Sequence, residues 1–264
     1  MSPNRDSQYS NRIVDSMEEI FGKGFLSPGG PQEVVRAFRD MPISGASVLD
    51  WGCGLGGATM ALARDLNAAS VLGIDVDAGN LERAAKNIED AGLNDRISLT
   101  LVEPGPMPLP DNRFDVIFTQ AALCHIAEKA EIMADYARVL VPGGRVMCVD
   151  WMKGDMTPPS PAYTDWDDIL RQEGLDFTFL TAGHHIEAMQ SVGFENVQVG
   201  DESETALKLA RDVLKHIEHG GRSSLLNALG EDGYERFHRR SIARAEALAD
   251  GGLIYGRLTG RKPA

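Results

Sequence analysis

The fold is decided by residues 48–57, which read Val48-Leu49-Asp50-Trp51-Gly52-Cys53-Gly54-Leu55-Gly56-Gly57. The apolar residues at the start of this stretch predict the end of a buried strand. The glycines after it allow a sharp turn in which the backbone can approach a ligand closely. Residues 58–66 are good helix formers and follow the turn directly. A strand, a glycine turn and a helix in this order are typical of a ligand-binding edge in an α/β domain.

The glycine turn does not by itself identify a cofactor. Gly52-x-Gly54-x-x-Gly57 fits the dinucleotide fingerprint, whereas Asp50-x-Gly52-x-Gly54 fits the loop that holds S-adenosylmethionine equally well. Asp75 ends the next apolar strand, where a carboxylate can accept hydrogen bonds from both hydroxyls of a ribose. Nicotinamide enzymes and S-adenosylmethionine enzymes share that feature, so these residues leave both cofactors open.

Strands and helices alternate along the first part of the chain. The predicted strands are 47–51, 70–75, 97–102, 114–119 and 144–150, and the predicted helices between them are 57–66, 79–92 and 127–140. This alternation indicates a parallel sheet with helices on both faces. After residue 150 we expect helices near 165–173, 181–192, 204–219, 222–229 and 233–249, and strands at 195–200 and 253–259. The whole pattern predicts a doubly wound, Rossmann-like sheet of seven strands with a reversed C-terminal strand pair.

We interpret residues 1–264 as one domain. Residues 1–46 form an N-terminal helical cover, with a loop before the first strand that could lie over a ligand. Residues 47–150 form the cofactor-binding core. Residues 151–264 supply a helical lid over the substrate and the C-terminal strands.

The composition argues against several classes of partner. The net charge is −13, with 39 acidic and 26 basic residues, which opposes binding to nucleic acid. No run approaches the roughly 20 apolar residues that cross a bilayer, and residues 1–6 lack the apolar core of a signal peptide. We expect a cytoplasmic protein that acts on a small molecule without a membrane partner; the oligomeric state stays unassigned.

Neither the cysteines nor the histidines predict a metal site. The cysteines lie in or beside apolar segments without metal-type spacing, and we expect them to be core residues without disulfides: Cys53, Cys124 and Cys148. The pairs His184-His185 and His216-x-x-His219 have no nearby Cys or acid that would complete a four-ligand site. We therefore expect no metal.

Three further features distinguish between the two cofactors. Leu109-Pro110-Asp111-Asn112-Arg113-Phe114-Asp115 leads into the fourth strand, Pro142-Gly143-Gly144 precedes the fifth, and a C-terminal strand pair stands in place of a second nucleotide-binding half. With these features the chain resembles the class I S-adenosylmethionine-dependent methyltransferases. The resemblance implies that the glycine loop takes the aminoacyl part of the cofactor and that Asp75 takes the ribose. It also implies that Glu103, after the third strand, meets the adenine amino group.

A narrower resemblance covers nearly the whole chain. It rests on short motifs that look like those of the phosphoethanolamine N-methyltransferases: Gln8-Tyr9, Ile20-Phe21-Gly22, Phe25-Leu26-Ser27-Pro28-Gly29-Gly30, Leu123-Cys124-His125 and the run from Pro142 to Asp150. Related enzymes that act on glycine, sarcosine and dimethylglycine share the motif from Gln120 to His125 and an aspartate comparable with Asp150 before Trp151.

This resemblance implies a set of site residues. Those that would hold S-adenosylmethionine are Ser27, Asp50, Gly52, Gly54, Asp75, Val76, Glu103 and Gln120. Those that would contact the substrate are Gln8, Ala121, Trp151, Phe177 and Arg244. Tyr9 and His125 would be catalytic, closing over the acceptor and assisting removal of its proton, because an ammonium has no lone pair to attack a methyl group. For His125 the alternative is a helix-start histidine packed in the core.

The chain departs from this family where the family holds the substrate phosphate. Uncharged residues stand at four of those positions, namely Ala121, Trp151, Leu175 and Phe177, and Asp176 adds a negative charge. Only Arg244 is basic there. A dianionic phosphate would be poorly held, so we expect a small amine without a phosphate.

Methyl transfer to carbon, oxygen or sulfur is the alternative function, and a nicotinamide-dependent oxidoreductase is a remote alternative. The aromatic residues after the fifth strand, Trp151, Tyr163, Trp166, Phe177 and Phe179, either line an amine pocket or pack as core.

Overall fold

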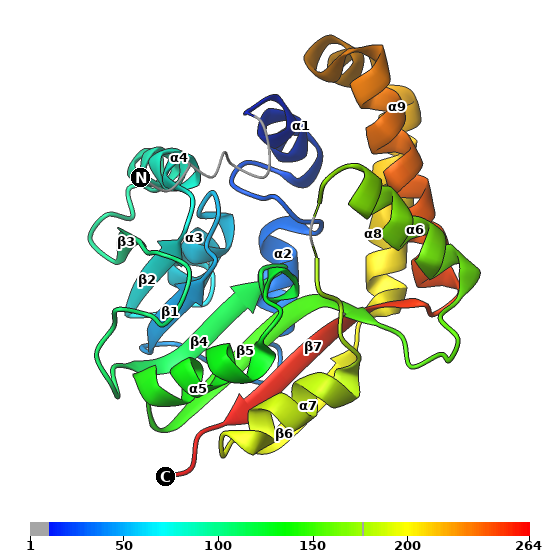
Figure 1. The fold of residues 1–264 in the computed structure, drawn as a ribbon. Coiled ribbons are helices and arrows are strands. Elements are labelled where there is room, and N and C mark those ends of the chain that lie inside the picture. The colour runs from blue at the N-terminus through cyan, green and yellow to red at the C-terminus, as the bar shows by residue number, and fades with distance from the viewer. Residues whose placement is uncertain (1–10, 176) are drawn as a thin grey trace, which may run out of the picture.

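A sheet of seven strands forms the centre of the computed structural model, which describes residues 11–175 and 177–264 (Figure 1). Its strands are β1 (Ser47–Trp51), β2 (Ser70–Asp75), β3 (Ile97–Leu101), β4 (Phe114–Gln120), β5 (Leu140–Lys153), β6 (Glu195–Asp201) and β7 (Leu253–Arg261). They lie in the order β3-β2-β1-β4-β5-β7-β6. The pairs from β3 to β5 are parallel, whereas β7 runs antiparallel to both β5 and β6. Within the predicted reversed C-terminal pair, β7 is therefore the reversed strand.

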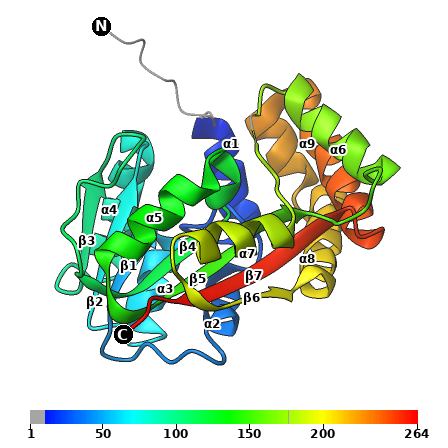
Figure 2. The ribbon, with the colours of Figure 1, turned by 60° about the horizontal axis from the view of Figure 1, so that its bottom comes forward.

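Helices cover both faces of this sheet. They are α1 (Asn11–Phe21), α2 (Gly30–Ala37), α3 (Gly57–Arg64), α4 (Ala78–Asp90), α5 (Lys129–Val139), α6 (Pro161–Gln172), α7 (Ala182–Ser191), α8 (Ser203–Lys215) and α9 (Arg222–Ala249), with short turns η1 (Leu123–His125) and η2 (His216–Gly220). Helices α2, α3 and α4 lie on one face and α5 and α7 on the other (Figures 1 and 2). None of the described helices combines the length and the apolar character that a membrane crossing requires.

The strands send alternate side chains into two apolar layers. Val48 and Val116 belong to the layer under α2 and α3, and their neighbours Leu49 and Ile117 belong to the layer under α5 and α7. All four are fully buried. This burial on both faces explains why the central strands read as continuous apolar runs. The three cysteines are also buried, as expected for core residues.

One predicted strand and one predicted pair of helices differ from the structure. Strand β5 is longer at both ends than the predicted strand 144–150, because Leu140 pairs with Phe114 of β4 and the residues up to Lys153 pair with β7. The predicted helices 222–229 and 233–249 form the single element α9, in which Gly230 has the non-helical angles φ 72° and ψ 173°. Gly230 thus divides α9 into two helical parts, and it lies in the gap between the two predicted helices.

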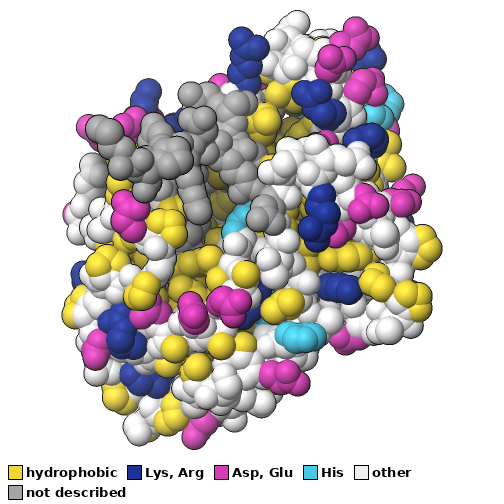
Figure 3. All heavy atoms as spheres, viewed as in Figure 1, with side chains coloured by type: hydrophobic (Ala, Val, Ile, Leu, Met, Phe, Trp, Pro, Cys, Tyr) yellow, Lys and Arg dark blue, Asp and Glu magenta, His cyan; other side chains and the backbone are white. Residues whose placement is uncertain are grey.

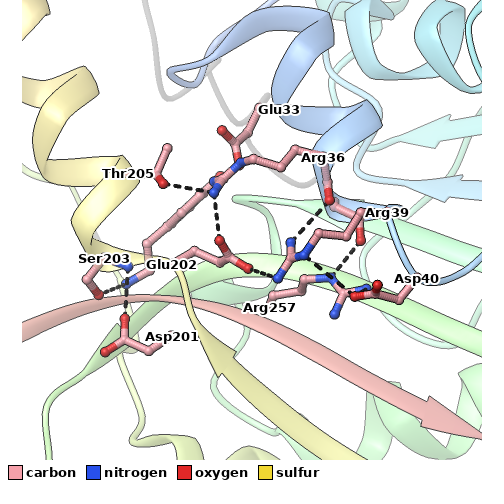
Figure 4. A network of polar contacts seen from close by, with 11 residues as sticks. Glu33, Arg36, Arg39, Asp40, Asp201, Glu202, Ser203, Thr205 and Arg257 are labelled. Atoms are coloured by element: carbon pink, nitrogen blue, oxygen red, sulfur yellow. Dashed lines mark hydrogen bonds and ion pairs between the residues drawn. The ribbon is translucent and has the colours of Figure 1, made fainter.

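Helices α6, α8 and α9 form the predicted helical lid at one end of the sheet, where α6 and α8 both pack on α9 (Figure 1). A polar network joins this lid to α2 (Figure 4). Glu202, which precedes α8, accepts hydrogen bonds from Arg36 and Arg39 at the end of α2, and Arg36 also pairs with Glu33 and donates to Thr205. Glu33 and Glu202 are largely buried and Arg36 is half-buried, whereas Arg39 is exposed, so the pair of Arg36 with Glu202 contributes most to fixing the N-terminal cover against the lid.

Candidate active site at the carboxyl edge of the sheet

The glycine loop after β1 is tied to the end of β2. Gly52 and Gly54 have φ angles of 73° and 52°, which favour glycine. The Gly52 and Cys53 N–H groups donate to the Ile74 carbonyl over 2.9 and 3.0 Å. A Cβ atom at Gly52 would lie 2.5 Å from Cβ of Ala122, so the loop also touches the segment after β4. The loop thus lies between the ends of three neighbouring strands.

Asp75, the last residue of β2, organises this loop. One carboxylate oxygen accepts the Gly54 N–H over 2.8 Å and the other accepts the Asp77 N–H over 2.9 Å. Burial raises the pKa of Asp75, and these hydrogen bonds oppose the rise. Each oxygen has further lone pairs, so the group can still accept hydrogen bonds from a ligand. Asp77 caps α4 by accepting the Asn80 N–H over 2.9 Å.

Two apolar side chains are exposed beside Asp75. Val76 is 59% exposed and Leu101, which pairs with Asp75 across the sheet, is 52% exposed. Exposed aliphatic residues next to a binding carboxylate suit the face of a flat ring. Leu101 is missing from the residues that the sequence predicts for the site, although its position at the end of β3 was a usable signal. Glu103 is exposed two residues beyond it.

Asp50 supports the loop from inside the core. Its side chain is 1% exposed, and it accepts a hydrogen bond from the Thr59 hydroxyl of α3 over 2.6 Å. Burial raises the pKa of Asp50 to about 7, and the negative charge of Asp75 adds to the rise. The Thr59 hydrogen bond joins β1 to the helix that follows the glycine loop.

His125 lies in the turn η1, just after the end of β4. Strand β4 is the neighbour of β1 in the sheet. Its ring is exposed and lies 4.5 Å from the ring of Phe177, measured between centroids, at an interplanar angle of 35°. The alternative of a histidine packed in the core is therefore wrong. Gln120, at the end of β4, donates to the Tyr255 hydroxyl over 3.3 Å.

The aromatic residues after β5 divide into two groups. Phe177 stacks on Phe179 at 5.2 Å, and Phe179 packs on Trp166 at 5.0 Å. Trp166 and Phe179 are buried, as is Tyr163 beside them, so these rings form a core that supports the less buried Phe177. On the face of the molecule that the space-filling view shows, hydrophobic side chains are spread among acidic and basic ones (Figure 3).

Trp151 forms the second group with Tyr255, at 4.6 Å between ring centroids. The half-buried Arg244 of α9 places its guanidinium 5.8 Å from the centre of the Trp151 ring. Strand β5 and helix α9 thus bring together two residues that the sequence predicts for the substrate site. Ala121, a third, has φ 51° just after β4.

The loop with Ser27 lies against the glycine loop. The Gly57 N–H donates to the Gly24 carbonyl over 2.9 Å, and Leu26 Cδ1 lies 3.5 Å from the position of a Cβ at Gly54. Ser27 itself is half-buried. The predicted site residues Gln8 and Tyr9 lie outside the described residues, as does Asp176.

Other candidate features of the sequence lie away from this edge. His216 lines a cavity of about 470 Å³ between α1, residues 28–32 and α8, which contains none of the predicted site residues. His185 is buried, its Nδ1 lies 2.9 Å from the Thr181 carbonyl oxygen, and burial lowers its pKa to about 4. Within residues 11–175 and 177–264, no group of three or more His, Cys, Asp or Glu side chains could hold a metal ion.

Comparison with known proteins gives a family match. The family model described as "Methyltransferase domain" matches residues 48–144. Phosphoethanolamine N-methyltransferase 3 of Arabidopsis thaliana is 30% identical over 213 residues, which are 80% of this chain and 41% of that protein. The chain thus spans less than half the length of this relative. The predicted resemblance to the methyltransferases is confirmed.

Two solved structures share the fold over nearly the whole chain. Haemonchus contortus phosphoethanolamine N-methyltransferase 2, in complex with phosphomonomethylethanolamine and S-adenosylhomocysteine, has a TM-score of 0.86 at 21% identity; the match covers 98% of this chain and 59% of that one. A putative sarcosine dimethylglycine methyltransferase from Galdieria sulphuraria has a TM-score of 0.81 at 19% identity, over 96% of this chain and 97% of that one. These likenesses confirm the predicted fold.

The raised pKa of Asp50 predicts how stability depends on pH. Because the folded protein holds this proton up to about pH 7 and the unfolded chain releases it near pH 4, its contribution to stability is complete below pH 4 and is lost as the pH rises through 7. Asp50→Asn cannot ionise, so between pH 5 and 7 the free energy of unfolding of the parent should fall relative to the variant by up to about 1.4 kcal/mol per pH unit. Urea unfolding of both proteins at several pH values measures this difference. If the free energies of unfolding of the parent and the variant changed equally with pH, Asp50 would have an ordinary pKa.

Proposed function

Since residues 48–144 are a methyltransferase domain, we propose that this protein transfers a methyl group from S-adenosylmethionine to the nitrogen of a small-molecule amine. The observation that supports the proposal is that two groups of residues, one for the cofactor and one for the acceptor, lie at the ends of the neighbouring strands β2, β1 and β4. The glycine loop and Asp75 follow β1 and β2, and the exposed His125 with Phe177 beside it follows β4. A cofactor bound over the first half would be next to an acceptor bound over the second.

The first half has the groups that the cofactor needs. Gly52 and Gly54 leave the backbone of the loop open to close approach, and Asp75 can accept hydrogen bonds from the ribose. Val76 and Leu101 offer exposed aliphatic surface to the adenine, with Glu103 beyond them. Ser27 belongs to the segment of the N-terminal cover that contacts the same loop through Gly24 and Leu26. When bound, S-adenosylmethionine supplies an activated methyl group, so these residues only have to hold and orient it.

The second half handles the proton of the acceptor. A protonated amine cannot attack, and a histidine titrates in the pH range in which an ammonium must lose its proton. His125 is exposed, so it can reach an acceptor, and Phe177 restricts its ring on one side. Tyr9 is its proposed partner, with Gln8 beside it in the sequence.

The acceptor half is aromatic rather than cationic, which favours an amine without a phosphate. Phe177 packs between His125 and Phe179, and Trp151 packs on Tyr255, so aromatic rings surround the proposed acceptor site. Aromatic rings favour an ammonium group over an anion. Ala121 supplies no charge, and Arg244, packed over Trp151, is the single cation among the proposed substrate residues. A dianionic phosphate needs more than one cationic partner when it leaves water.

The direct test is an acceptor screen with labelled S-adenosylmethionine and mass analysis of the products. We expect N-methylation within a panel of small amines and amino acids, and phosphoethanolamine should be a poor acceptor because little positive charge faces it. Thiols and phenols complete the panel. Methylation confined to a thiol, a phenol or a carbon centre would refute the amine, and efficient methylation of phosphoethanolamine would refute the unphosphorylated acceptor.

Asp75→Ala should weaken binding of S-adenosylhomocysteine about a hundredfold or more, because it removes charge-assisted hydrogen bonds to the ribose and releases Gly54. Asp75→Asn keeps a carbonyl acceptor and should lose less. Asp77→Ala is the matched control, since it removes the cap of α4 at a cost of about 1 kcal/mol without touching the ribose. Titration calorimetry gives the affinities and urea unfolding gives the stabilities. Unchanged binding by Asp75→Ala would overturn the ribose assignment.

Tyr9→Phe and His125→Ala should each lower kcat about a hundredfold and leave the affinity for S-adenosylhomocysteine nearly unchanged. If the two side chains act as a unit, the double variant loses less than the product of the two single losses. His184→Ala, which changes an exposed histidine of α7, is the control for general effects. Full turnover by both single variants would remove the catalytic assignment.

A further inference from the structure

Lys129, at the start of α5, contacts the backbone on both sides of His125 and the backbone just after Phe177. The residue is only 3% exposed. The ammonium donates to the Leu123 carbonyl over 2.7 Å, to the Ile126 carbonyl, and to the Thr178 carbonyl over 3.1 Å. An ammonium has three donors, so all of them are used on backbone oxygens.

These three carbonyls belong to two segments that are far apart in the sequence. Leu123 and Ile126 flank His125 in the turn η1, and Thr178 follows Phe177. The Thr178 N–H also donates to the Cys124 carbonyl over 2.7 Å, directly between the two segments. The ammonium therefore joins the backbone that carries the histidine to the backbone that carries the ring packed on it.

Helix stability does not explain a lysine at this position. A cation in the first turn of a helix opposes the helix dipole. Burial adds a desolvation cost, which lowers the pKa of Lys129. The buried Asp150, which accepts the Cys124 N–H over 3.2 Å, offsets part of this cost electrostatically. The hydrogen bonds of Lys129 therefore contribute mainly by connecting the turn that contains His125 to the segment that contains Phe177.

We propose that Lys129 is a positioning residue that fixes His125 against Phe177 and so holds the acceptor half of the site in its working geometry. This inference rests on the proposed function. Lys129 touches no reacting atom; it acts through the backbone of the turn and of residues 177–179. Its effect should therefore appear in the order of these two segments and in turnover, and much less in cofactor binding.

The experiment compares Lys129→Met, which keeps the length and removes the donors, with Lys129→Gln, which keeps two N–H donors. Lys215→Met, at an exposed ion pair with Asp212, is the matched control. Amide hydrogen exchange should speed up in both 123–126 and 177–179 by tenfold or more in Lys129→Met, and less in Lys129→Gln. With an amine acceptor, kcat should fall at least tenfold and the affinity for S-adenosylhomocysteine should change less than threefold.

The proposal would be overturned if Lys129→Met showed the same amide exchange rates as the parent protein in both segments, or the same kcat. A merely structural lysine would speed up exchange throughout the protein and weaken cofactor binding as much as turnover, which would also overturn it. Where Lys129→Met does not fold, Lys129→Gln decides by the same measurements. Hydrogen exchange needs no acceptor, so it tests the connection even where the amine screen fails, and the two failures are distinguishable.

Discussion

The backbone of the N-terminal cover and the backbone of α3 touch at two glycines, and the geometry of the site depends on this contact. The Gly57 N–H donates to the Gly24 carbonyl, and a Cβ at Gly57 would lie 2.5 Å from that oxygen. A side chain there would push the two segments apart. Because Gly57 also closes the glycine loop, the same contact places the loop around Ser27 over the turn that follows β1. The cover and the cofactor loop are thus one unit.

Two buried carboxylates hold the two halves of the site in place. Asp50 in β1 accepts from Thr59, which fixes the helix after the glycine loop, and Asp150 in β5 accepts the Cys124 N–H, which fixes the turn before His125. Burial raises the pKa of both groups. A buried carboxylate is costly unless it is hydrogen-bonded, so each one stabilises the segment that supplies its donors. Strand β4 lies between β1 and β5, which brings the two halves together.

The sequence predicts well where the residues of the proposed cofactor half lie, because strand ends determine their positions. The predicted bounds of β1 and β2 are those of the structure, and Asp75 and the glycines therefore lie where the predicted strands place them. The acceptor half was less predictable. The contact of His125 with Phe177 depends on a chain segment that returns about fifty residues later, and Lys129 reads in the sequence as an ordinary surface charge at a helix start. The extension of β5 beyond Asp150 likewise depends on pairing with β7, which is distant in the sequence.

The proposed acceptor and the proposed cofactor are surrounded by different segments of the chain. The described groups near the proposed acceptor come from the turn after β4, from the end of β5, from the segment between α6 and α7 and from α9, whereas most groups near the proposed cofactor come from the ends of β1, β2 and β3. Changes in the segment that contains Phe177, or at Arg244, alter the acceptor half without disturbing the glycine loop. A fold shared at about one-fifth identity with a phosphoethanolamine enzyme and a sarcosine enzyme is therefore compatible with different acceptors. Specificity in this chain should thus be sought around Trp151, near the end of β5, and Phe177, between α6 and α7, and not in the glycine motif.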